Sequence, residues 1–281
     1  MDRFDYIIVG AGTAGCVLAN RLSRDPSKRV LLLEAGKKDN YFWIDIPVGY
    51  LYTIGNPRTD WCFETEPEAG LNGRSIGYAR GKVLGGCSSI NAMIYMRGQK
   101  SDYDHWAALG NRGWGWSDVL PIFRRSEDYQ HGSDDFHGSG GELRVEERRV
   151  NWEILDVWRD AAEQCGIPKI DEFNRGDNFG NAYFQMNQRT GKRWSATRAF
   201  LDDVRNRPNL SSHHSNQLVL ELLWITVVAD HERDVSVDAF ALYIVWITND
   251  RGFSNRGMQY QCILDFGGAN AMSGDIQNVV D

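Results

Sequence analysis

The chain has 281 residues, 42% of them hydrophobic and 25% charged, which is typical of a globular protein with a sizeable core. Its net charge of −7 argues against nucleic acid as the main partner. We find no apolar run near the roughly 18 residues of a membrane span and no signal-peptide pattern. Five scattered cysteines without CxxC spacing favour reduced thiols over disulfides or zinc. We therefore expect a cytoplasmic protein, with peripheral membrane association left open.

The first 34 residues contain a strand–turn–helix–strand pattern. The apolar run Tyr6–Val9 is typical of a buried parallel strand, and Gly10-Ala-Gly12-Thr-Ala-Gly15 follows it directly. Apolar residues then recur at helical spacing as far as Leu22, and Val30–Leu33 predicts a second strand that leads into Glu34. This arrangement is the context in which a GxGxxG sequence binds a dinucleotide.

Each residue of this pattern has a physical role in dinucleotide binding. Gly10 permits a tight turn, Gly12 lets a pyrophosphate approach the backbone, and Gly15 lets helix and strand pack closely. The N–H groups at the start of the helix favour phosphate, and an acidic residue about 20 positions on binds a ribose. The candidate residues are Gly10, Gly12, Thr13, Ala14, Gly15, Glu34 and Ala35. FAD and NAD share this pattern, and the alternative is a glycine-rich turn in an ordinary α/β domain.

A second glycine-rich segment, Gly81–Ile94, also favours ligand binding. Consecutive small residues give a ligand close access to backbone N–H groups, and Ser88 and Asn91 add polar side chains. The alternative is a glycine-rich surface loop. Between the two glycine-rich segments, we expect loops with one helical turn over Tyr41–Tyr52 and a hairpin from Trp61–Glu66 and Arg74–Ala79.

Residues 101–201 predict further helices and strands. We expect one helix from Ser101 to Leu109 and another over Asn151–Cys165. Two further helices are expected to follow N-caps at Ser117 and Ser195. Strands are expected at Gly141–Val145 and Phe179–Met186. The Asn151–Cys165 helix is amphipathic, with Ile154, Leu155, Trp158 and Ala162 on one face. The charges of Arg124–Glu127 are interpreted as solvated. A metal site at His131, Asp134, Asp135 and His137 is a minor alternative to a polar loop.

Several separated motifs resemble the glucose–methanol–choline (GMC) flavoprotein oxidoreductases, most closely their choline dehydrogenase-like branch. They include Phe4–Gly15 with Leu33–Gly36, Trp61–Pro67, Arg80–Asn91, Tyr129–Gly141, and Arg193–Arg198 with Arg207–Leu210. The resemblance implies an α/β, Rossmann-like FAD-binding domain and the beginning of an interleaved α+β substrate domain. It divides the chain into an FAD-binding part at 1–145, the start of a substrate-binding part at 146–210, and an unassigned tail at 211–281.

The resemblance also implies that the dinucleotide is FAD and that the second glycine-rich segment runs past its pyrophosphate and flavin ring. The residues carried over are Gly81, Val83, Gly85, Gly86, Ser88, Asn91, Ala92, Met93 and Ile94. Some relatives attach FAD covalently through a histidine at the position of Ile90. Since Ile90 has no nucleophilic atom, we expect FAD to be bound non-covalently and no metal to be required.

The implied activity is oxidation of the CH–OH group of a primary alcohol, choline-like or other, by hydride transfer to FAD. No histidine up to Leu210 matches a family catalytic position, and His105, His131 and His137 are interpreted as surface or loop residues. The catalytic residues are therefore unknown, and the chain is expected to be truncated and inactive. The alternative functions are a non-catalytic flavin-binding protein and an NAD(P)-dependent reductase, although no second GxGxxG unit is present.

From Ser211 onward the sequence is expected to depart from the family pattern. A frame-shifted or truncated coding sequence, a divergent segment and an insertion are the three explanations for this tail, which contains the apolar runs Leu218–Val228 and Phe240–Ile247. The substrate, electron acceptor and oligomeric state stay open.

Overall fold

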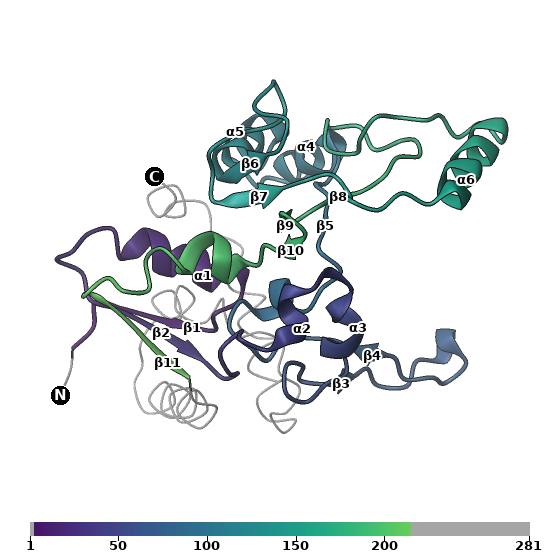
Figure 1. Ribbon diagram of the computed structural model, residues 1–281. Coiled ribbons are helices and arrows are strands. Elements are labelled where there is room, and N and C mark those ends of the chain that lie inside the picture. The colour runs from purple at the N-terminus through teal and green to yellow at the C-terminus, as the bar shows by residue number, and fades with distance from the viewer. Residues whose placement is uncertain (1–2, 215–281) are drawn as a thin grey trace. The chain divides into compact units, whose positions relative to one another are not determined.

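The computed structural model describes residues 3–214, which form two compact units (Figure 1). Unit 1 combines residues 3–91 with residues 195–214, and unit 2 is the intervening segment 92–194. The chain thus leaves unit 1 and returns to it. The unit boundaries differ from the expected division at residue 145, which concerned the roles of the segments and stays a prediction. The two apolar runs of the tail, Leu218–Val228 and Phe240–Ile247, lie outside the described residues.

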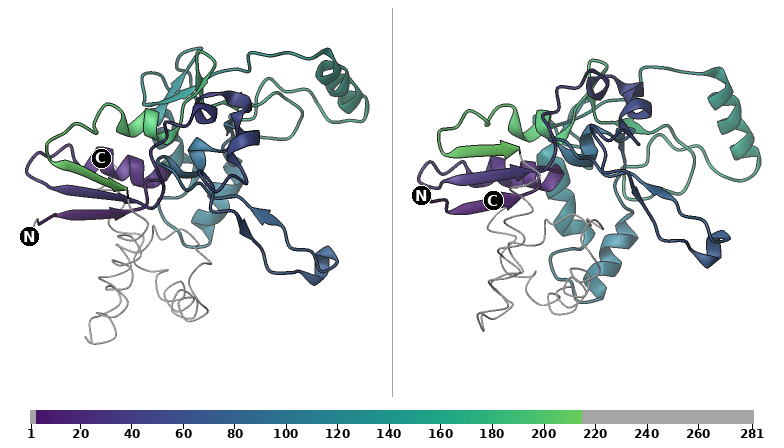
Figure 2. Two further views of the ribbon diagram at one scale, coloured as in Figure 1. Left: turned by 60° about the horizontal axis from the view of Figure 1, so that its bottom comes forward. Right: turned by 90° about the horizontal axis from the view of Figure 1, so that it is seen from below.

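Unit 1 is built on a parallel sheet with strand order β1–β2–β11. β1 (Tyr6–Val9) and β11 (Leu210–His214) both pair with β2 (Val30–Glu34), and Figure 2 shows the three strands as one layer. All five residues of β2 are buried. Their position in the middle of this sheet explains why the strand is a continuous apolar run rather than an alternating one.

Helix α1 (Thr13–Leu22) connects β1 to β2 and completes the predicted strand–helix–strand unit. Its buried face has small side chains, Cys16 and Ala19, which permit close packing. The helix predicted from Ser195 is a single π-helical turn, η4 (Thr197–Leu201), beside α1 in Figure 1. The Asn20 side chain donates to Phe200 O at 2.7 Å, which ties the returning chain to α1. The Rossmann-like prediction is therefore confirmed for this unit.

The strand β11 includes Ser211–His214, the first four residues of the tail that the sequence left unassigned. Ser211 pairs with Leu31 and His214 with Glu34, so the chain continues along β2 as a third parallel strand. The sequence Ser-Ser-His-His carries no apolar signal. The strand is specified by its backbone ladder with β2, which local sequence patterns do not reveal.

The rest of unit 1 consists of short elements. The stretch Tyr41–Tyr52 is more helical than predicted, since most of it lies in three consecutive turns. The predicted hairpin is confirmed, with β3 and β4 antiparallel but only two residues long each. The elements are α2 (Phe42–Asp45), η1 (Pro47–Gly49), α3 (Tyr50–Thr53), β3 (Phe63–Glu64), η2 (Ala69–Leu71), β4 (Gly77–Tyr78) and η3 (Gly86–Ser89).

Unit 2 contains three helices and three two-stranded pairings within its described residues. β5 pairs antiparallel with β8, β6 pairs parallel with β7, and β9 pairs antiparallel with β10. Only the end of the strand predicted at Phe179–Met186 forms, as β8. The elements are β5 (Ile94–Tyr95), α4 (Lys100–Ala108), α5 (Trp116–Ser126), β6 (Glu127–Tyr129), β7 (Leu143–Val145), α6 (Glu153–Gln164), β8 (Gln185–Met186), β9 (Gln188–Arg189) and β10 (Lys192–Arg193).

The N-cap predicted at Ser117 is wrong, because α5 starts after Gly115. The Gly115 N–H donates to the Asp118 carboxylate at 3.1 Å, so an acidic residue in the first turn closes the helix start. The cap predicted at Ser195 is partly realised. Its hydroxyl accepts a hydrogen bond from Arg198 N at 3.4 Å, although η4 starts two residues later.

Helix α6 is amphipathic as predicted, but its apolar face is exposed apart from Ala162. Ile154 and Trp158 are 65% and 61% exposed. The polar face makes the contacts with the body of unit 2: Arg159 donates to the Asn181 side chain at 3.1 Å, and Asp160 binds Lys169. Residues 3–214 include no helix long and apolar enough to cross a bilayer.

Candidate functional site

The glycines of the first motif have the geometry that their predicted roles require. Gly10 has φ +93°, a backbone conformation that residues other than glycine rarely adopt. A Cβ on Gly15 would lie 2.0 Å from Gly10 O, so helix and strand are in direct backbone contact there. At Gly12, by contrast, an added Cβ would meet no atom of residues 3–214 within 4 Å. The first and third glycines are thus needed by the fold, whereas the second borders open space.

The amino terminus of α1 has no side-chain cap among residues 3–214. Gly12 is its N-cap residue, and the first turn contains no acidic residue. The first N–H groups of a helix lack intrahelical partners and carry the positive end of its dipole. The backbone N–H groups of Thr13 and Ala14, next to the open space at Gly12, are therefore donors suited to a phosphate group.

Glu34 closes the turn at the end of β2. Its carboxylate accepts hydrogen bonds from Ala11 N and Gly36 N, both at 2.8 Å. Burial raises the pKa of Glu34, and the two backbone donors only partly oppose that rise. The side chain is therefore a positioned acceptor whose charged form gains from further donors. Ala35 follows it and is half-buried.

The second glycine-rich segment packs directly on the first. Gly85 N donates to Ala11 O at 2.8 Å, and a Cβ on Gly86 would lie 2.8 Å from Gly12 Cα. A Cβ on Gly81 would lie 2.3 Å from the Gly86 carbonyl carbon. Since these contacts join backbone to backbone, no larger residue fits without movement. The structure brings the two motifs together beside the α1 amino terminus.

Other candidates in the segment support this loop. The Ser88 hydroxyl donates to Gly85 O at 2.6 Å and accepts from Ala196 N at 2.9 Å, so it fixes the loop to the returning chain. Val83 is buried in an apolar cluster with Ile44 and Ile90. Thr13 and Asn91 are exposed.

The last three candidates, Ala92, Met93 and Ile94, belong to unit 2. Met93 is buried and has φ +62°, which is uncommon for a residue with a side chain. Ile94 is the first residue of β5 and is 49% exposed. The candidate residues therefore span both units, with the majority in unit 1.

Two interpretations of charged residues in unit 2 hold only in part. His137 lies in a loop, as predicted, but it is fully buried, and its ring nitrogens bind Glu127 and Glu172 at distances of 2.9–3.0 Å. In the segment predicted to be solvated, the two arginines are exposed, whereas Glu127 is fully buried. His105 and His131 are exposed, as predicted. The partners of His137 lie 10 and 35 residues away in the sequence, and no local pattern links them.

In the loop that contains His137, the carboxylate of Asp134 binds protein groups. Asp134 accepts hydrogen bonds from the N–H groups of Phe136 and His137, both at 2.7 Å, and binds Arg175. Residues 3–214 contain no group of three or more His, Cys, Asp or Glu side chains that could hold a metal ion.

The GMC oxidoreductase family model matches residues 4–237 of the chain. The chain belongs to the GMC oxidoreductase family. The resemblance seen in the motifs ends at Leu210, whereas the match to the family continues to residue 237 and includes β11. This assignment agrees with the Rossmann-like fold of unit 1 and with the packing of its two glycine motifs.

Two relatives with dehydrogenase names are about 40% identical to this chain over three quarters of its length. It is 43% identical to the alcohol dehydrogenase [acceptor] of Pseudomonas putida over 78% of the chain and 40% of that relative. It is 40% identical to the mitochondrial choline dehydrogenase of Homo sapiens, over 75% of the chain and 37% of that enzyme. The chain thus spans about two fifths of the length of these relatives.

Solved structures of similar proteins have the same fold. Pyridoxine 4-oxidase from Mesorbium loti matches with a TM-score of 0.72 and 38% identity, over 76% of this chain and 42% of that one. An FAD-dependent oxidoreductase from Chaetomium thermophilum matches with a TM-score of 0.69 and 32% identity, over 75% of this chain and 38% of that one.

Proposed function

We propose that the chain binds FAD and is the cofactor-binding part of a GMC-type oxidoreductase that acts on the CH–OH group of a primary alcohol. The observation that carries the proposal is the backbone contact between Gly86 and Gly12 beside the uncapped start of α1. The backbone at Gly12 is thereby left open among the described residues, where the helix dipole and N–H groups favour an anion. Family membership supports FAD as the dinucleotide.

The residues present fit the parts of FAD. Gly10, Gly12 and Gly15, with the N–H groups of Thr13 and Ala14, would hold the pyrophosphate, and Glu34 with Ala35 would receive the ribose. Hydroxyl donors on a ribose would stabilise the charged form of Glu34, whose pKa is raised by burial. The flavin end would be held by the second segment, through Gly81, Val83, Gly85, Gly86, Ser88, Asn91, Ala92, Met93 and Ile94.

We propose non-covalent binding, because the side chain at position 90 can form no bond to the flavin. Ile90 is 2% exposed and packs against Ile44 and Val83. Denaturing the FAD-loaded chain with acid and separating protein from solution tests this directly. All flavin should appear in the soluble fraction, and flavin that stays with the protein would contradict the proposal.

Bound FAD would supply the hydride acceptor for alcohol oxidation, and the reaction also needs a base for the hydroxyl proton. Among residues 3–214, His137 is held between two carboxylates, His105 and His131 are exposed, and His213 and His214 lie in β11, paired along β2. None is matched to a catalytic position of the family. We therefore expect this 281-residue chain to bind FAD without oxidising alcohols.

The substrate is proposed only as a class, a primary alcohol. The names of the relatives, an alcohol dehydrogenase and a choline dehydrogenase, support a choline-like or other alcohol. The four cysteines within residues 3–214 are free thiols, which supports a reducing compartment such as the cytoplasm.

The second candidate is a flavin-binding protein with no catalytic role. Turnover with a primary alcohol and an artificial electron acceptor separates the two, measured on this chain and on a longer version that carries the remaining length of its relatives. Turnover by the longer version alone supports the oxidoreductase proposal. Tight FAD binding by both without turnover by either favours the second candidate.

A further inference from the structure

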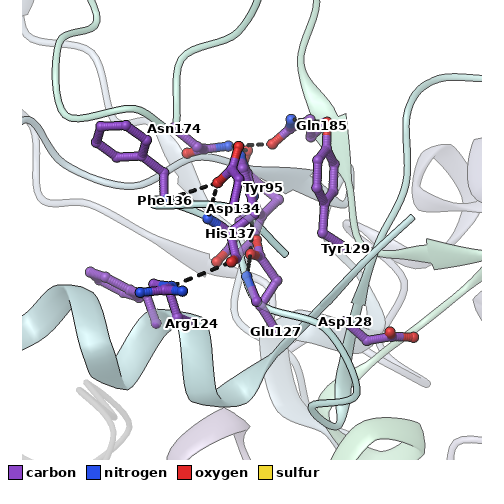
Figure 3. A network of polar contacts seen from close by, with 12 residues as sticks. Tyr95, Arg124, Glu127, Asp128, Tyr129, Asp134, Phe136, His137, Asn174 and Gln185 are labelled. Atoms are coloured by element: carbon purple, nitrogen blue, oxygen red, sulfur yellow. Dashed lines mark hydrogen bonds and ion pairs between the residues drawn. The ribbon is translucent and has the colours of Figure 1, made fainter. Parts of the chain in front are cut away.

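Unit 2 contains a closed ring of polar contacts, which we call the ion ring; Figure 3 labels four of its members, Glu127, His137, Asn174 and Gln185. It runs from the Arg97 guanidinium to Glu127 at 3.0 Å, from Glu127 to His137 at 3.0 Å, and from His137 to Glu172 at 2.9 Å. Glu172 accepts from the Gln185 side chain, and Gln185 Oε1 accepts from Asn174 Nδ2 at 2.6 Å. The six members are Arg97, Glu127, His137, Glu172, Asn174 and Gln185.

Asn174 closes the ring by binding the backbone of Arg97 itself. Its side-chain oxygen accepts from Arg97 N at 2.8 Å, and its amide donates to Tyr95 O at 3.2 Å. The Arg97 side chain also donates to Tyr95 Oη at 3.1 Å and Phe136 O at 2.7 Å. The segment Tyr95–Arg97 is therefore held through both its backbone and its side chains.

The ring is buried and balanced in charge. All six members are at most 8% exposed. Burial alone would lower the pKa of His137, but its bonds to Glu127 and Glu172 raise that pKa to about 9. At neutral pH two cations, Arg97 and His137, thus face two carboxylates, and Glu172 also pairs with Arg175 outside the ring at 2.7 Å. Buried charges are tolerated only when paired, so each member depends on its neighbours.

The segment held by the ring directly follows the flavin-binding candidates Ala92–Ile94. β5 pairs with β8 through Ile94–Met186 and Tyr95–Gln185, and Gln185 is itself a ring member. Met93 O accepts from Asn187 N at 2.8 Å, and Met93 keeps its positive φ. A residue with a side chain stays in that conformation only where its surroundings fix it.

We propose that the ion ring is a positioning device that holds the backbone of Ala92–Ile94 in the conformation that receives the flavin. Glu127 and His137 are positioning residues in this scheme, since they act through Arg97, Gln185 and the β5–β8 pair. The inference rests on the proposed FAD function. An apolar core would stabilise unit 2 equally well, but directional bonds to Tyr95 and Arg97 also specify the geometry of the chain.

The test uses Glu127→Gln in the 281-residue chain, with Asp128→Asn as the matched control. The amide introduced by Glu127→Gln would place a donor against Arg97 or against the donors His137 and Gly138, which opens the ring at one point. Asp128 is the next residue of β6 and pairs with Arg144 at 2.9 Å outside the ring. Hydrogen–deuterium exchange of residues 92–97, measured without ligand, reports how firmly this backbone is held. Titration with FAD measures binding of the whole cofactor, and titration with ADP measures binding of its adenine end alone.

Glu127→Gln should speed exchange in residues 92–97 and weaken FAD binding roughly 3- to 30-fold, with ADP binding unchanged. Asp128→Asn should leave all three unchanged. Unaltered exchange and FAD affinity in Glu127→Gln would overturn the inference, as would an equal loss of FAD and ADP affinity. If the wild-type chain binds neither ligand, the proposed function fails, and the exchange result alone decides whether the ring positions the segment.

Arg97→Lys provides a second variant if Glu127→Gln does not fold. It keeps a positive charge near Glu127 but removes the fork that reaches Tyr95 Oη and Phe136 O. The same pattern of faster exchange and selectively weaker FAD binding is expected. Wild-type behaviour in this variant would count against the inference.

Discussion

Replacing Gly12 and Gly15 separately with alanine should divide ligand binding from folding. A Cβ at Gly12 meets no atom of the described residues within 4 Å, and Gly12 has φ −69°, which alanine adopts readily. The loss of an N-cap glycine and the lower entropy of the unfolded chain oppose each other, so stability should change by less than about 1 kcal/mol. The methyl group would nevertheless occupy the space where the proposed pyrophosphate touches the backbone. An overpacking cost of about 1–3 kcal/mol corresponds to a roughly 5- to 150-fold weaker FAD affinity.

Gly15→Ala is the matched control, with the opposite result expected. Its Cβ would lie 2.0 Å from Gly10 O and 3.1 Å from Gly10 C, so α1 must move away from β1. Destabilisation should reach or exceed about 3 kcal/mol. Urea unfolding followed by circular dichroism measures stability, and quenching of flavin fluorescence measures FAD binding. A folded Gly12→Ala variant with wild-type FAD affinity would refute the placement of the pyrophosphate.

Three further predictions follow from Glu34, His137 and Trp158. Glu34→Gln leaves the N–H group of Ala11 or Gly36 without an acceptor, which should cost about 1–3 kcal/mol in urea unfolding and weaken FAD binding; unchanged values would argue against a structured carboxylate. The pKa of His137 is raised from 6.5 to about 9, so its stabilising contribution is complete below pH 6.5 and is lost as pH rises through about 9. A His137→Gln variant should therefore lack this pH-dependent slope in the free energy of unfolding. An identical slope in the variant would exclude His137 as its source. The side chain of Trp158 is 61% exposed, so Trp158→Ala should alter stability by less than about 0.5 kcal/mol, and a larger loss would mean that the apolar face of α6 is covered in solution.

The sequence was most informative where local patterns and tertiary contacts agree. The β1–α1–β2 unit could be predicted because a buried strand, a glycine turn and an amphipathic helix each leave a local signal. The association of Gly81–Ile94 with this unit came from family resemblance, since nothing in the spacing indicates that Gly86 lies against Gly12.

Elements defined by distant partners escaped prediction. β11 has a polar sequence and is specified by its pairing with β2, about 180 residues earlier in the chain. Glu127 follows a run of charged and polar residues and His137 lies in a loop rich in glycine and aspartate, so both look like ordinary surface residues. Only the fold brings Arg97 and Glu172 to them and makes burial favourable. Buried polar networks of this kind leave no periodic signal.

The measurement that tests the central proposal most directly is a titration of the purified chain with FAD, followed by gel filtration and a visible spectrum. We predict saturable binding of one FAD per chain, a flavin spectrum that travels with the protein, and full release of flavin on denaturation. A protein that remains colourless and shows no saturable binding would contradict FAD binding by this chain.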